Sequence, residues 1–440
     1  LHLSIRRQRQ MCIRDSSLVD LGFRYTIEQN PIEGGGPVLI AERVEDPSFT
    51  TVLTYGHGDV VRGYDDQWRQ GLNPWILTRE GDRWFGRGTA DNKGQHTINL
   101  AALRCVLACR GCLGFNIKIL IETGEEVGSL GLREICAANK ERLAADVFIA
   151  SDGPRIAPAK PTVFMGSRGA FNFDMTVDLR EGGHHSGNWG GLLANPGIVL
   201  AHALAVITSP TGEIKVPQWR PAEIPDSVRD VLRDLTLEQD QDGPEIDPNW
   251  GEPGLTPPEQ VFGWNSFEVL AFEAGNPKNP VNAIPPKASA HCQVRFVVPT
   301  DPEKLLPALR EFLDKRGFSQ VSLSADSRVA PATRLEPDHP WVKWVIGSIE
   351  YTTGKEVAVI PNLGGTLPND VFSETLGLPT IWIPHSYAGC SQHAADEHLL
   401  GSVGREALQI MTGVWWDLGD QRMACLLYTS PSPRDRGCSR

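Results

Sequence analysis

Between Thr51 and Asp152 the sequence alternates short apolar runs with longer stretches of helical period, and no other feature constrains the fold as strongly. The apolar runs end at His57, shortly before Glu125 and shortly before Asp152. This strand–helix–strand–helix–strand order predicts a parallel sheet, because each helix carries the chain back to the start of the next strand. Candidate reactive residues follow the strand ends, which is where open α/β sheets place their ligand sites.

A different pattern begins after Met165 and predicts a separate, inserted domain. Apolar alternation indicates strands in GAFNFDMTVDL, FEVLAFEAG, ASAHCQVRFVV and VSLSADS, whereas NPGIVLAHALAVI and PEKLLPALREFLDKRG have helical period. The resulting order β-α-β-β-α-β predicts a ferredoxin-like module. The α/β pattern resumes after Val329. The Pro- and Asp-rich stretch 209–260 has no role that its residues reveal, and it either caps a cleft or alters subunit contacts.

We therefore expect an α/β domain, with a mixed sheet flanked by helices, built from residues 17–164 and 329–424. Residues 165–328 would form the inserted α+β domain. The two ends, 1–16 and 425–440, resemble translated read-through of a sequencing adaptor, so they are expected to be non-native flanks.

Charge and cysteine content narrow the possible partners and location. A formal net charge of −12 disfavours nucleic acids and anionic membranes, because both attract basic surfaces. No apolar run approaches the roughly 18–20 residues that a membrane-spanning helix needs. The cysteines show no disulfide framework, which favours a reducing compartment, and we expect a cytoplasmic location.

Two strand ends carry pairs of residues suited to a metal centre. His57 and Asp59 point to the same side of an extended chain, so His57 can bind a metal while Asp59 or another carboxylate orients its ring. Glu125 and Glu126 are adjacent carboxylates, which repel one another unless a cation or a shared proton is present. The second pair is therefore the harder one to explain as an ordinary surface feature.

Three further candidates each have an ordinary alternative. Asp91 is suited to a helix N-cap, Asp152 to a turn, and His393 to an exposed surface. Taken together with His57 and Glu126, however, they provide the oxygen and nitrogen ligands that suit zinc without cysteine. Three ligand carboxylates against two Zn²⁺ would leave one net positive charge, which a bound hydroxide neutralises.

The motifs resemble those of the M20 metallopeptidases and deacylases, in order and spacing, over essentially everything between the flanks. This group contains carnosinase-like dipeptidases, acetylornithine deacetylase and succinyl-diaminopimelate desuccinylase. The resemblance implies a zinc-exopeptidase-like catalytic domain, an inserted lid that forms a homodimer, and a cis peptide between Asp91 and Asn92. The motifs that carry it are TYGHGDVV, GRGTADNKGQ, ETGEEVGS, SDG, HHSGNWGG, NPVNAIPPKA and the QH of SQHAADEH.

The resemblance also implies how the metal ligands are shared. Asp91 would bridge two zinc ions, for which cobalt or manganese are possible substitutes. His57 and Asp152 would complete one metal site, and Glu126 and His393 the other.

The catalytic roles follow from the same resemblance. Glu125 would be the general base that takes a proton from a metal-bridging water and passes it to the leaving nitrogen. Asp59 would orient His57. His185 would reach from a neighbouring subunit to stabilise the oxyanion, and it is preferred to the adjacent His184 because it directly precedes Ser-Gly.

Five residues match positions that hold the substrate's carboxylate or carbonyl oxygen, namely Asn282, Arg295, Gly364, Gly365 and Thr366. For Arg295 the ordinary alternative is a strand charge that faces solvent. The loop GGTLPND is closer to carnosinase-like members than to acetylornithine deacetylases, which favours a dipeptide or N-acyl amino acid as substrate. The alternatives are a deacylase of the acetylornithine or succinyl-diaminopimelate type, an inactive metal-binding module, and a fold without metal in which the carboxylates are caps and turns.

Overall fold

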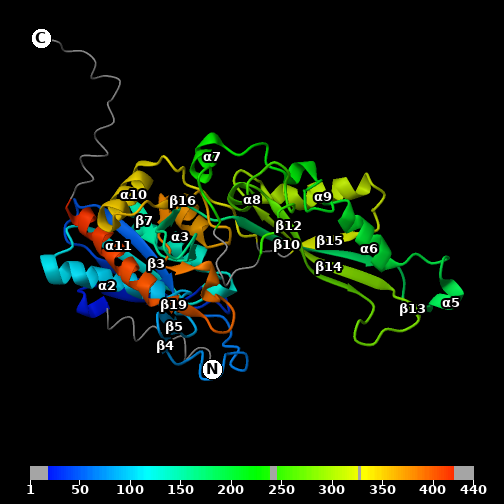
Figure 1. Ribbon diagram of the computed structural model, residues 1–440, viewed down its shortest axis with the longest axis horizontal. Helices are drawn as coiled ribbons and strands as arrows, with labels where there is room; N and C mark the ends of the chain where they lie inside the picture. Colours follow the sequence, from blue (N-terminus) through cyan, green and yellow to red (C-terminus); the bar gives the residue numbers. More distant parts are fainter. Residues whose placement is uncertain (1–17, 238–244, 326–328, 421–440) are drawn as a thin grey trace, which may run out of the picture.

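The structure, a computed structural model, describes residues 18–237, 245–325 and 329–420, so both suspected flanks lie outside the described residues. Its larger part, here called the main unit, is built on an eight-stranded sheet in the order β1-β2-β6-β3-β7-β17-β9-β16 (Figure 1). Strand β3 is parallel to β6 and β7, and β17 is parallel to β7, whereas β1, β2 and β6 pair antiparallel. The predicted mixed sheet is confirmed. Its strands are β1 (Arg24–Glu28), β2 (Val38–Arg43), β3 (Thr51–His57), β6 (Asn116–Glu122), β7 (Val147–Ala150), β9 (Thr162–Phe164), β16 (Ala358–Ile360) and β17 (Thr380–Trp382).

Helices cover both faces of this sheet. The side chain of Val52 packs in a core with helices α2 (Lys93–Arg110), α10 (Pro340–Thr353) and α11 (Gly401–Gly419). Its neighbour Leu53 points the opposite way, into a core with α3 (Leu132–Ala138), α7 (Asp226–Leu232) and α8 (Pro257–Phe262). This opposition follows from the two-residue period of a strand. Strands buried on both faces explain why the sequence shows apolar runs here rather than alternation.

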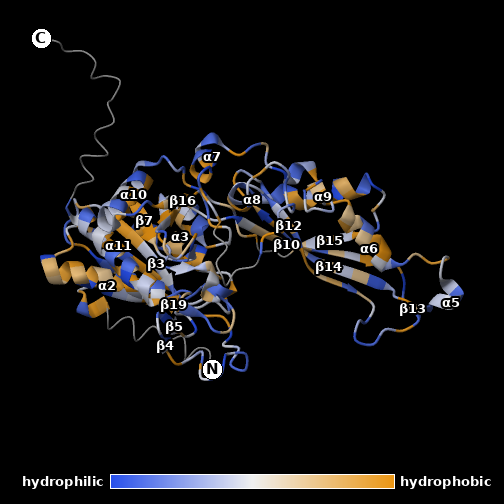
Figure 2. Ribbon diagram, viewed as in Figure 1, coloured by the Kyte–Doolittle hydropathy of each residue, from blue (hydrophilic) through white to orange (hydrophobic). Residues whose placement is uncertain are grey.

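The second part, here called the inserted unit, has the predicted β-α-β-β-α-β order. Its antiparallel sheet runs β12-β14-β10-β15, and the buried side chains of that sheet pack against α6 and α9. Figure 2 shows the hydrophobic residues of both units gathered mainly in strands and on parts of the helices. The elements are β10 (Gly169–Asp178), α6 (Pro196–Ala205), β12 (Ser266–Ala274), β14 (Lys287–Phe296), α9 (Leu305–Asp314) and β15 (Ser322–Ala325).

The end of the inserted unit that lies farthest from the main unit, here called the tip, carries a short two-stranded pairing (Figure 1). Strand β11 (His184–His185) pairs with β13 (Ala283–Ile284), and α5 (Ser186–Trp189) follows directly.

The segment 209–260, whose role was open, reaches back to the main unit. Val228 and Leu232 of α7 and Phe262 of α8 share a buried core with strands of the eight-stranded sheet. The segment therefore attaches the inserted unit to the α3 face of the main unit.

Some elements differ from the sequence prediction. The helical period of 129–143 predicts a single helix, but the stretch contains two, α3 and α4 (Lys140–Leu143), because Asn139 leaves the helical conformation and its side chain donates to the carbonyl of Ile135 at 2.9 Å. The sequence also predicts a last helix from about Glu397 onward, but that helix begins at Gly401, since β19 (His398–Leu400) pairs with β5 (Arg83–Phe85) first. The remaining short elements are β4 (Thr78–Glu80), β8 (Pro154–Arg155), β18 (Ser386–Tyr387), and the single turns Glu125–Val127, Pro217–Trp219, Pro302–Lys304, Val371–Thr375 and Ala388–Cys390.

None of the described helices combines the length and the apolar character that crossing a membrane requires.

Candidate metal centre and cleft

Asp91 lies at the middle of the candidate site, with one histidine at each of its carboxylate oxygens. Its Oδ1 is 2.8 Å from Nε2 of His57, and its Oδ2 is 2.9 Å from Nε2 of His393. Nε2 of His57 is also 3.6 Å from Oδ2 of Asp152. Nε2 of His393 is 3.1 Å from Oε2 of Glu126. The two oxygens of one buried carboxylate thus face two separate groups of donors.

The fold brings these residues together because three neighbouring parallel strands end at one edge of the sheet. His57 is the last residue of β3, Asp152 follows β7, and Glu126 lies in the turn after β6. Asp91 precedes α2, although the residue that caps this helix is Asn92. The expected cis peptide joins Asp91 to Asn92.

Asp59 connects the histidine to the glutamate pair. Its Oδ1 is 3.5 Å from Nδ1 of His57, and its two oxygens accept the backbone N–H groups of Glu125 at 3.3 Å and Glu126 at 3.1 Å. Oε1 of Glu126 accepts the backbone N–H of Val61 at 3.2 Å, which leaves Oε2 for His393. One carboxylate therefore sets both the ring of His57 and the turn that carries the two glutamates.

Glu125 borders the centre, and its Oε2 lies 3.9 Å from Nε2 of His57. Burial raises the pKa of Glu125 well above its usual range, and the charges of Asp152 and Asp91 add to the rise although His57 opposes it. A carboxylate in such surroundings accepts a proton more readily than an exposed one, which is the property that a general base requires.

The electrostatics of the centre favour bound cations. In the described part of the chain, the only basic ion-pair partners of Asp59, Asp91, Glu125, Glu126 and Asp152 are the imidazoles of His57 and His393. Hydrogen bonds to two of these carboxylates raise the pKa of His393 to about 10, and burial followed by the charge of Asp91 raises the pKa of Asp152 to about 7. The shift of His393 shows that the carboxylates around it attract positive charge, whereas the shift of Asp152 comes first from burial.

The donor set also fits a metal ion geometrically. His57, Asp91 and Glu126 each offer one ligand atom, and these atoms lie within 4.8 Å of one another. Oδ2 of Asp152 is buried and has no hydrogen-bond partner among the described residues. A buried carboxylate oxygen without a donor is costly, and coordination to a cation removes that cost.

A cavity of about 710 Å³ opens beside the centre. Arg295 and the loop from Gly364 to Thr366 line it, as do Asp91, Glu125, Asp152 and His393. Nη1 of Arg295 donates to Oγ1 of Thr366 at 2.6 Å, and Arg295 is half-buried rather than turned to solvent. Nε of Arg168, a half-buried neighbour that the sequence did not single out, donates to the carbonyl of Gly364 at 2.9 Å.

Two predicted site residues lie elsewhere in this chain. His185 and Asn282 are exposed at the tip of the inserted unit, far from the metal centre of the same chain (Figure 1). They belong to one local structure there, since the backbone N–H of Ser186 donates to the carbonyl of Asn282 at 2.9 Å.

The sequence analysis did not identify the buried ion pair between Arg87 and Glu397, which contacts the backbone of Asp91. The carboxylate of Glu397 accepts Nη1 of Arg87 at 2.7 Å, together with the backbone N–H groups of Gly88, Ala90 and Asp91 at 3.0 to 3.1 Å. Nη2 of Arg87 donates to the carbonyl of Ala394 at 2.7 Å. The pair therefore ties the loop that carries Asp91 to the loop that carries His393.

Gln392 was also missed as a site residue, although it stands next to His393. Its Nε2 donates to Oδ2 of Asp91 at 2.5 Å. The signal in the sequence was its place in the QH motif, next to a predicted ligand.

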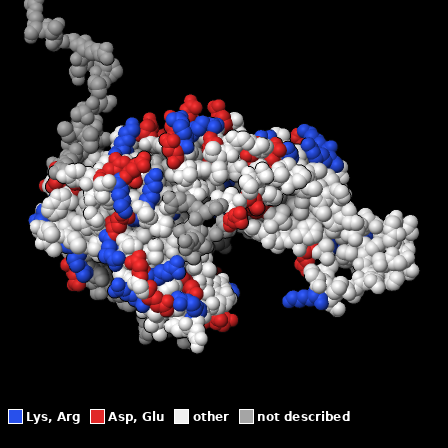
Figure 3. All heavy atoms as spheres, viewed as in Figure 1, with Lys and Arg blue, Asp and Glu red and all other residues white. Residues whose placement is uncertain are grey.

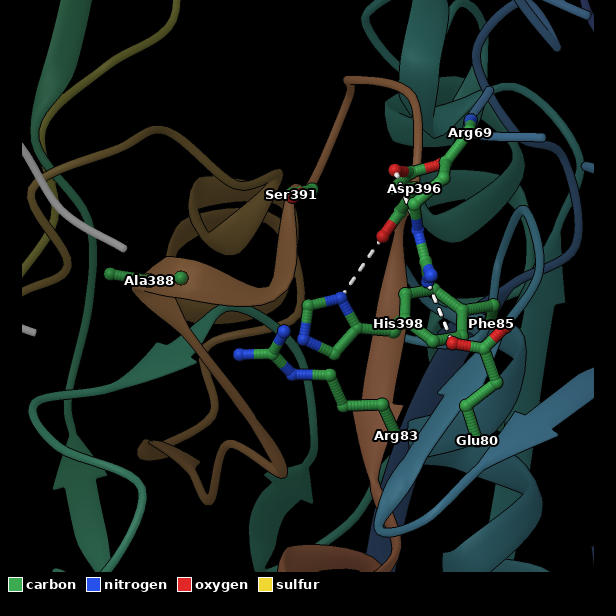
Figure 4. A pocket seen from close by; sticks show the side chains of 9 residues that line it. Arg69, Glu80, Arg83, Phe85, Ala388, Ser391, Asp396 and His398 are labelled. Carbon is green, nitrogen blue, oxygen red and sulfur yellow. Dashed lines mark hydrogen bonds and ion pairs between the residues drawn. The ribbon is translucent and has the colours of Figure 1, made fainter. Parts of the chain in front are cut away.

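A second hollow, of about 480 Å³, is lined by Ser391 and Asp396, which flank His393 in the chain (Figure 4). Nη2 of Arg69 pairs with Oε2 of Glu80 at 2.9 Å, and the ring of His398 bonds the carbonyl of Asp396 at 3.0 Å. Ala388 lines both hollows. Arg69 also holds the loop that carries His393, because its backbone N–H donates to Oδ1 of Asp396 at 3.0 Å.

The chain matches known proteins along most of its length. A model of Peptidase family M20/M25/M40 matches residues 53–417. Human beta-Ala-His dipeptidase is 37% identical over 186 residues, which are 41% of this chain and 36% of the human protein. The chain thus aligns with little more than a third of that relative's length. Cysteinylglycine-S-conjugate dipeptidase of Corynebacterium striatum is 28% identical over 371 residues, or 80% of this chain and 77% of that protein.

Solved structures share the fold. An M20 family metallo-carboxypeptidase, Sso-CP2 from Sulfolobus solfataricus, superposes with a TM-score of 0.79 at 24% identity over 94% of each chain. Human carnosine dipeptidase 1 gives a TM-score of 0.75 at 22% identity, covering 94% of this chain and 90% of the human one. The combination of a main unit with an inserted unit is therefore the fold of these peptidases.

Proposed function

Because the chain belongs to peptidase family M20/M25/M40, we propose that it is a di-zinc metallohydrolase that cleaves an amide bond in a dipeptide or an N-acyl amino acid. The observation that carries this proposal is the arrangement around Asp91, whose two oxygens face two groups of donors beside a cavity with a half-buried arginine.

In this proposal Asp91 would help to hold both metal ions. His57 and Asp152 would hold one ion, and Glu126 and His393 would hold the other. When bound, such ions polarise the amide carbonyl and lower the pKa of a water molecule. Imidazole and carboxylate donors without thiolates suit zinc, and they also accept cobalt or manganese.

Glu125 is the proposed general base. It borders both the metal centre and the cavity, so it can accept a proton from the attacking water and release it to the leaving amine nitrogen. Asp59 supports this step by fixing the backbone of the Glu125 turn and the ring of His57.

Arg295, Gly364, Gly365 and Thr366 are proposed to hold the free carboxylate of the substrate. A guanidinium presents paired N–H donors that match the two oxygens of a carboxylate. The hydrogen bond from Arg295 to Thr366 holds that guanidinium against the loop.

A second copy of the chain is proposed to complete the site with His185 and Asn282. Strand β12 is an edge of its sheet and exposes Val269, Leu270 and Phe272, a surface suited to pairing with another copy. The face of the tip around α5 is largely uncharged (Figure 3). In a homodimer the tip of one copy would then reach the cavity of the other.

The test is turnover of a panel of dipeptides and N-acyl amino acids by metal-reconstituted protein. Hydrolysis of dipeptides that requires added metal would support the proposal. Turnover of acyl amino acids alone would instead indicate a deacylase, and two tightly bound metals without turnover would indicate a binding module.

A further inference from the structure

The cavity beside the metal centre is lined by both polar and apolar side chains. The polar ones include candidate metal ligands and Arg295. The apolar ones, here together called the apolar wall, are Ile156, Leu237, Ile246, Phe262, Ile360 and Leu363. Most of its members are not explained by a need to bind metal or carboxylate.

Much of the apolar wall is the accessible edge of a hydrophobic core. Phe262, Ile360 and Leu363 are buried members of the core on the α3 face, and their exposed fractions are 6%, 2% and 8%. Ile156 and Leu237 pack against the same core. Side chains held in this way present a fixed shape to a ligand.

The apolar wall lies next to the proposed carboxylate anchor. A Cβ placed on Gly364 would be 3.7 Å from Cε1 of Phe262. The Phe262 ring therefore lies close to a residue of the proposed anchor. Because an amino acid side chain branches from the carbon that bears the carboxylate, an anchored C-terminal residue must place its side chain within a few bonds of this point.

Resting on the proposed dipeptidase function, we propose that the cavity selects substrates whose C-terminal residue has a bulky apolar side chain, such as leucine or phenylalanine. The apolar wall removes that side chain from water, whereas glycine or a charged residue at this position leaves the wall unused or desolvates a charge.

This assignment also gives the 209–260 segment a role. Leu237 and Ile246 come from that segment, and Phe262 follows it at the end of α8. The segment thus supplies two of the six residues of the apolar wall, so in this proposal it contributes to specificity rather than chemistry.

The first experiment measures kcat/KM of the metal-loaded protein for Ala-Leu, Ala-Phe, Ala-Gly, Ala-Asp, Leu-Gly and Phe-Gly. The expected result is a preference of about 10- to 100-fold for Ala-Leu and Ala-Phe over Ala-Gly, which corresponds to burying one large apolar side chain. A preference set by the N-terminal residue instead, or equal rates for all six, would overturn the inference while leaving a dipeptidase. Failure to cleave any dipeptide would overturn the proposed function as well.

The second experiment compares Ile246→Ser with Ile27→Ser. Both isoleucines are exposed to a similar degree, 41% and 39%, but Ile27 lies on β1 away from the cavity. Ile246→Ser should lower the Ala-Leu to Ala-Gly ratio of kcat/KM severalfold, and Ile27→Ser should leave the ratio unchanged. Equal ratios in both variants would count against the apolar wall, and Phe262→Ala, which also lowers stability, should reduce the ratio further.

Discussion

At the scale of single residues, Glu125 is the side chain whose replacement should separate chemistry from metal binding. Because Glu125 is not among the proposed ligands, Glu125→Gln should lower kcat by about 10²- to 10⁴-fold while both metals remain bound. Turnover and metal content, measured on the same sample, check this. The control is Glu134→Gln, an exposed acid on α3. Loss of metal together with activity would instead make Glu125 a ligand.

His385 should make stability depend on pH. Burial, followed by the charge of Arg155, lowers the pKa of His385 from 6.5 to about 3. The folded state keeps this ring neutral, so its stability is fully present above about pH 6.5 and is lost as the pH falls towards 3, by about 1.4 kcal/mol per pH unit.

The variant His385→Asn should therefore lose less stability than the unmodified protein between about pH 6 and pH 4. Denaturant unfolding at several pH values measures the two slopes. His202→Asn, at an exposed histidine of α6, serves as the control and should keep the original slope. Identical slopes in all three proteins would contradict the assignment to His385.

The sequence indicated the candidate reactive residues better than the residues that hold them in place. His57 and Glu125 were recognisable because they follow apolar strands, and strand ends converge in a parallel sheet. The Asp91 loop is held by Glu397, 306 residues away along the chain. Such a pairing leaves no local pattern, because only the folded chain brings the two together.

At the scale of elements, the Arg87–Glu397 pair joins two loops that carry proposed ligands. Both side chains are 1% exposed, so Arg87→Leu would leave a buried carboxylate without its cation, at a cost of about 3–5 kcal/mol. We expect a lower unfolding temperature and weaker metal binding, measured by thermal unfolding and by metal titration.

The matched control for this pair is Arg405→Leu. Arg405 pairs with Asp82 at 3.2 Å on the surface, where such a contact contributes about 0–1 kcal/mol. A similar loss of stability in both variants would argue against a special role for the buried pair.

Helices and strands were predictable from the sequence where one period dominated the pattern of apolar residues. The apolar runs before His57 and Glu125 became β3 and β6, and the β-α-β-β-α-β order of the inserted unit was legible from alternation. The prediction of one helix over 129–143 was wrong because Asn139 bonds back to its own helix and interrupts it. The place of the 209–260 segment could not be predicted, since its contacts with the main unit are long-range.

At the scale of the whole molecule, the proposed homodimer makes each site depend on two chains. Glu125→Gln and His185→Ala should each be nearly inactive alone, because each lacks one part of every site. Mixing them under conditions that allow exchange should restore about a quarter of the activity, since half the dimers are mixed and each has one intact site. Turnover before and after mixing checks this.

Two results would contradict the shared site. If activity does not recover on mixing, in samples that are shown to exchange subunits, then His185 acts within its own chain or takes no part in catalysis. A monomer with full activity would do the same.

The inserted unit contacts the main unit at more places than the two points where the chain passes from one unit to the other. Near those points the backbone N–H of Ala170 donates to the carbonyl of Ala330 at 2.9 Å, and α7 and α8 add a further attachment through the α3-face core. Phe262 and Leu363 belong to that core, whereas Arg295 lies on β14 of the inserted unit. The angle between the two units therefore sets the distance from Arg295 to the apolar wall. The binding of a ligand that contacts both would depend on that angle.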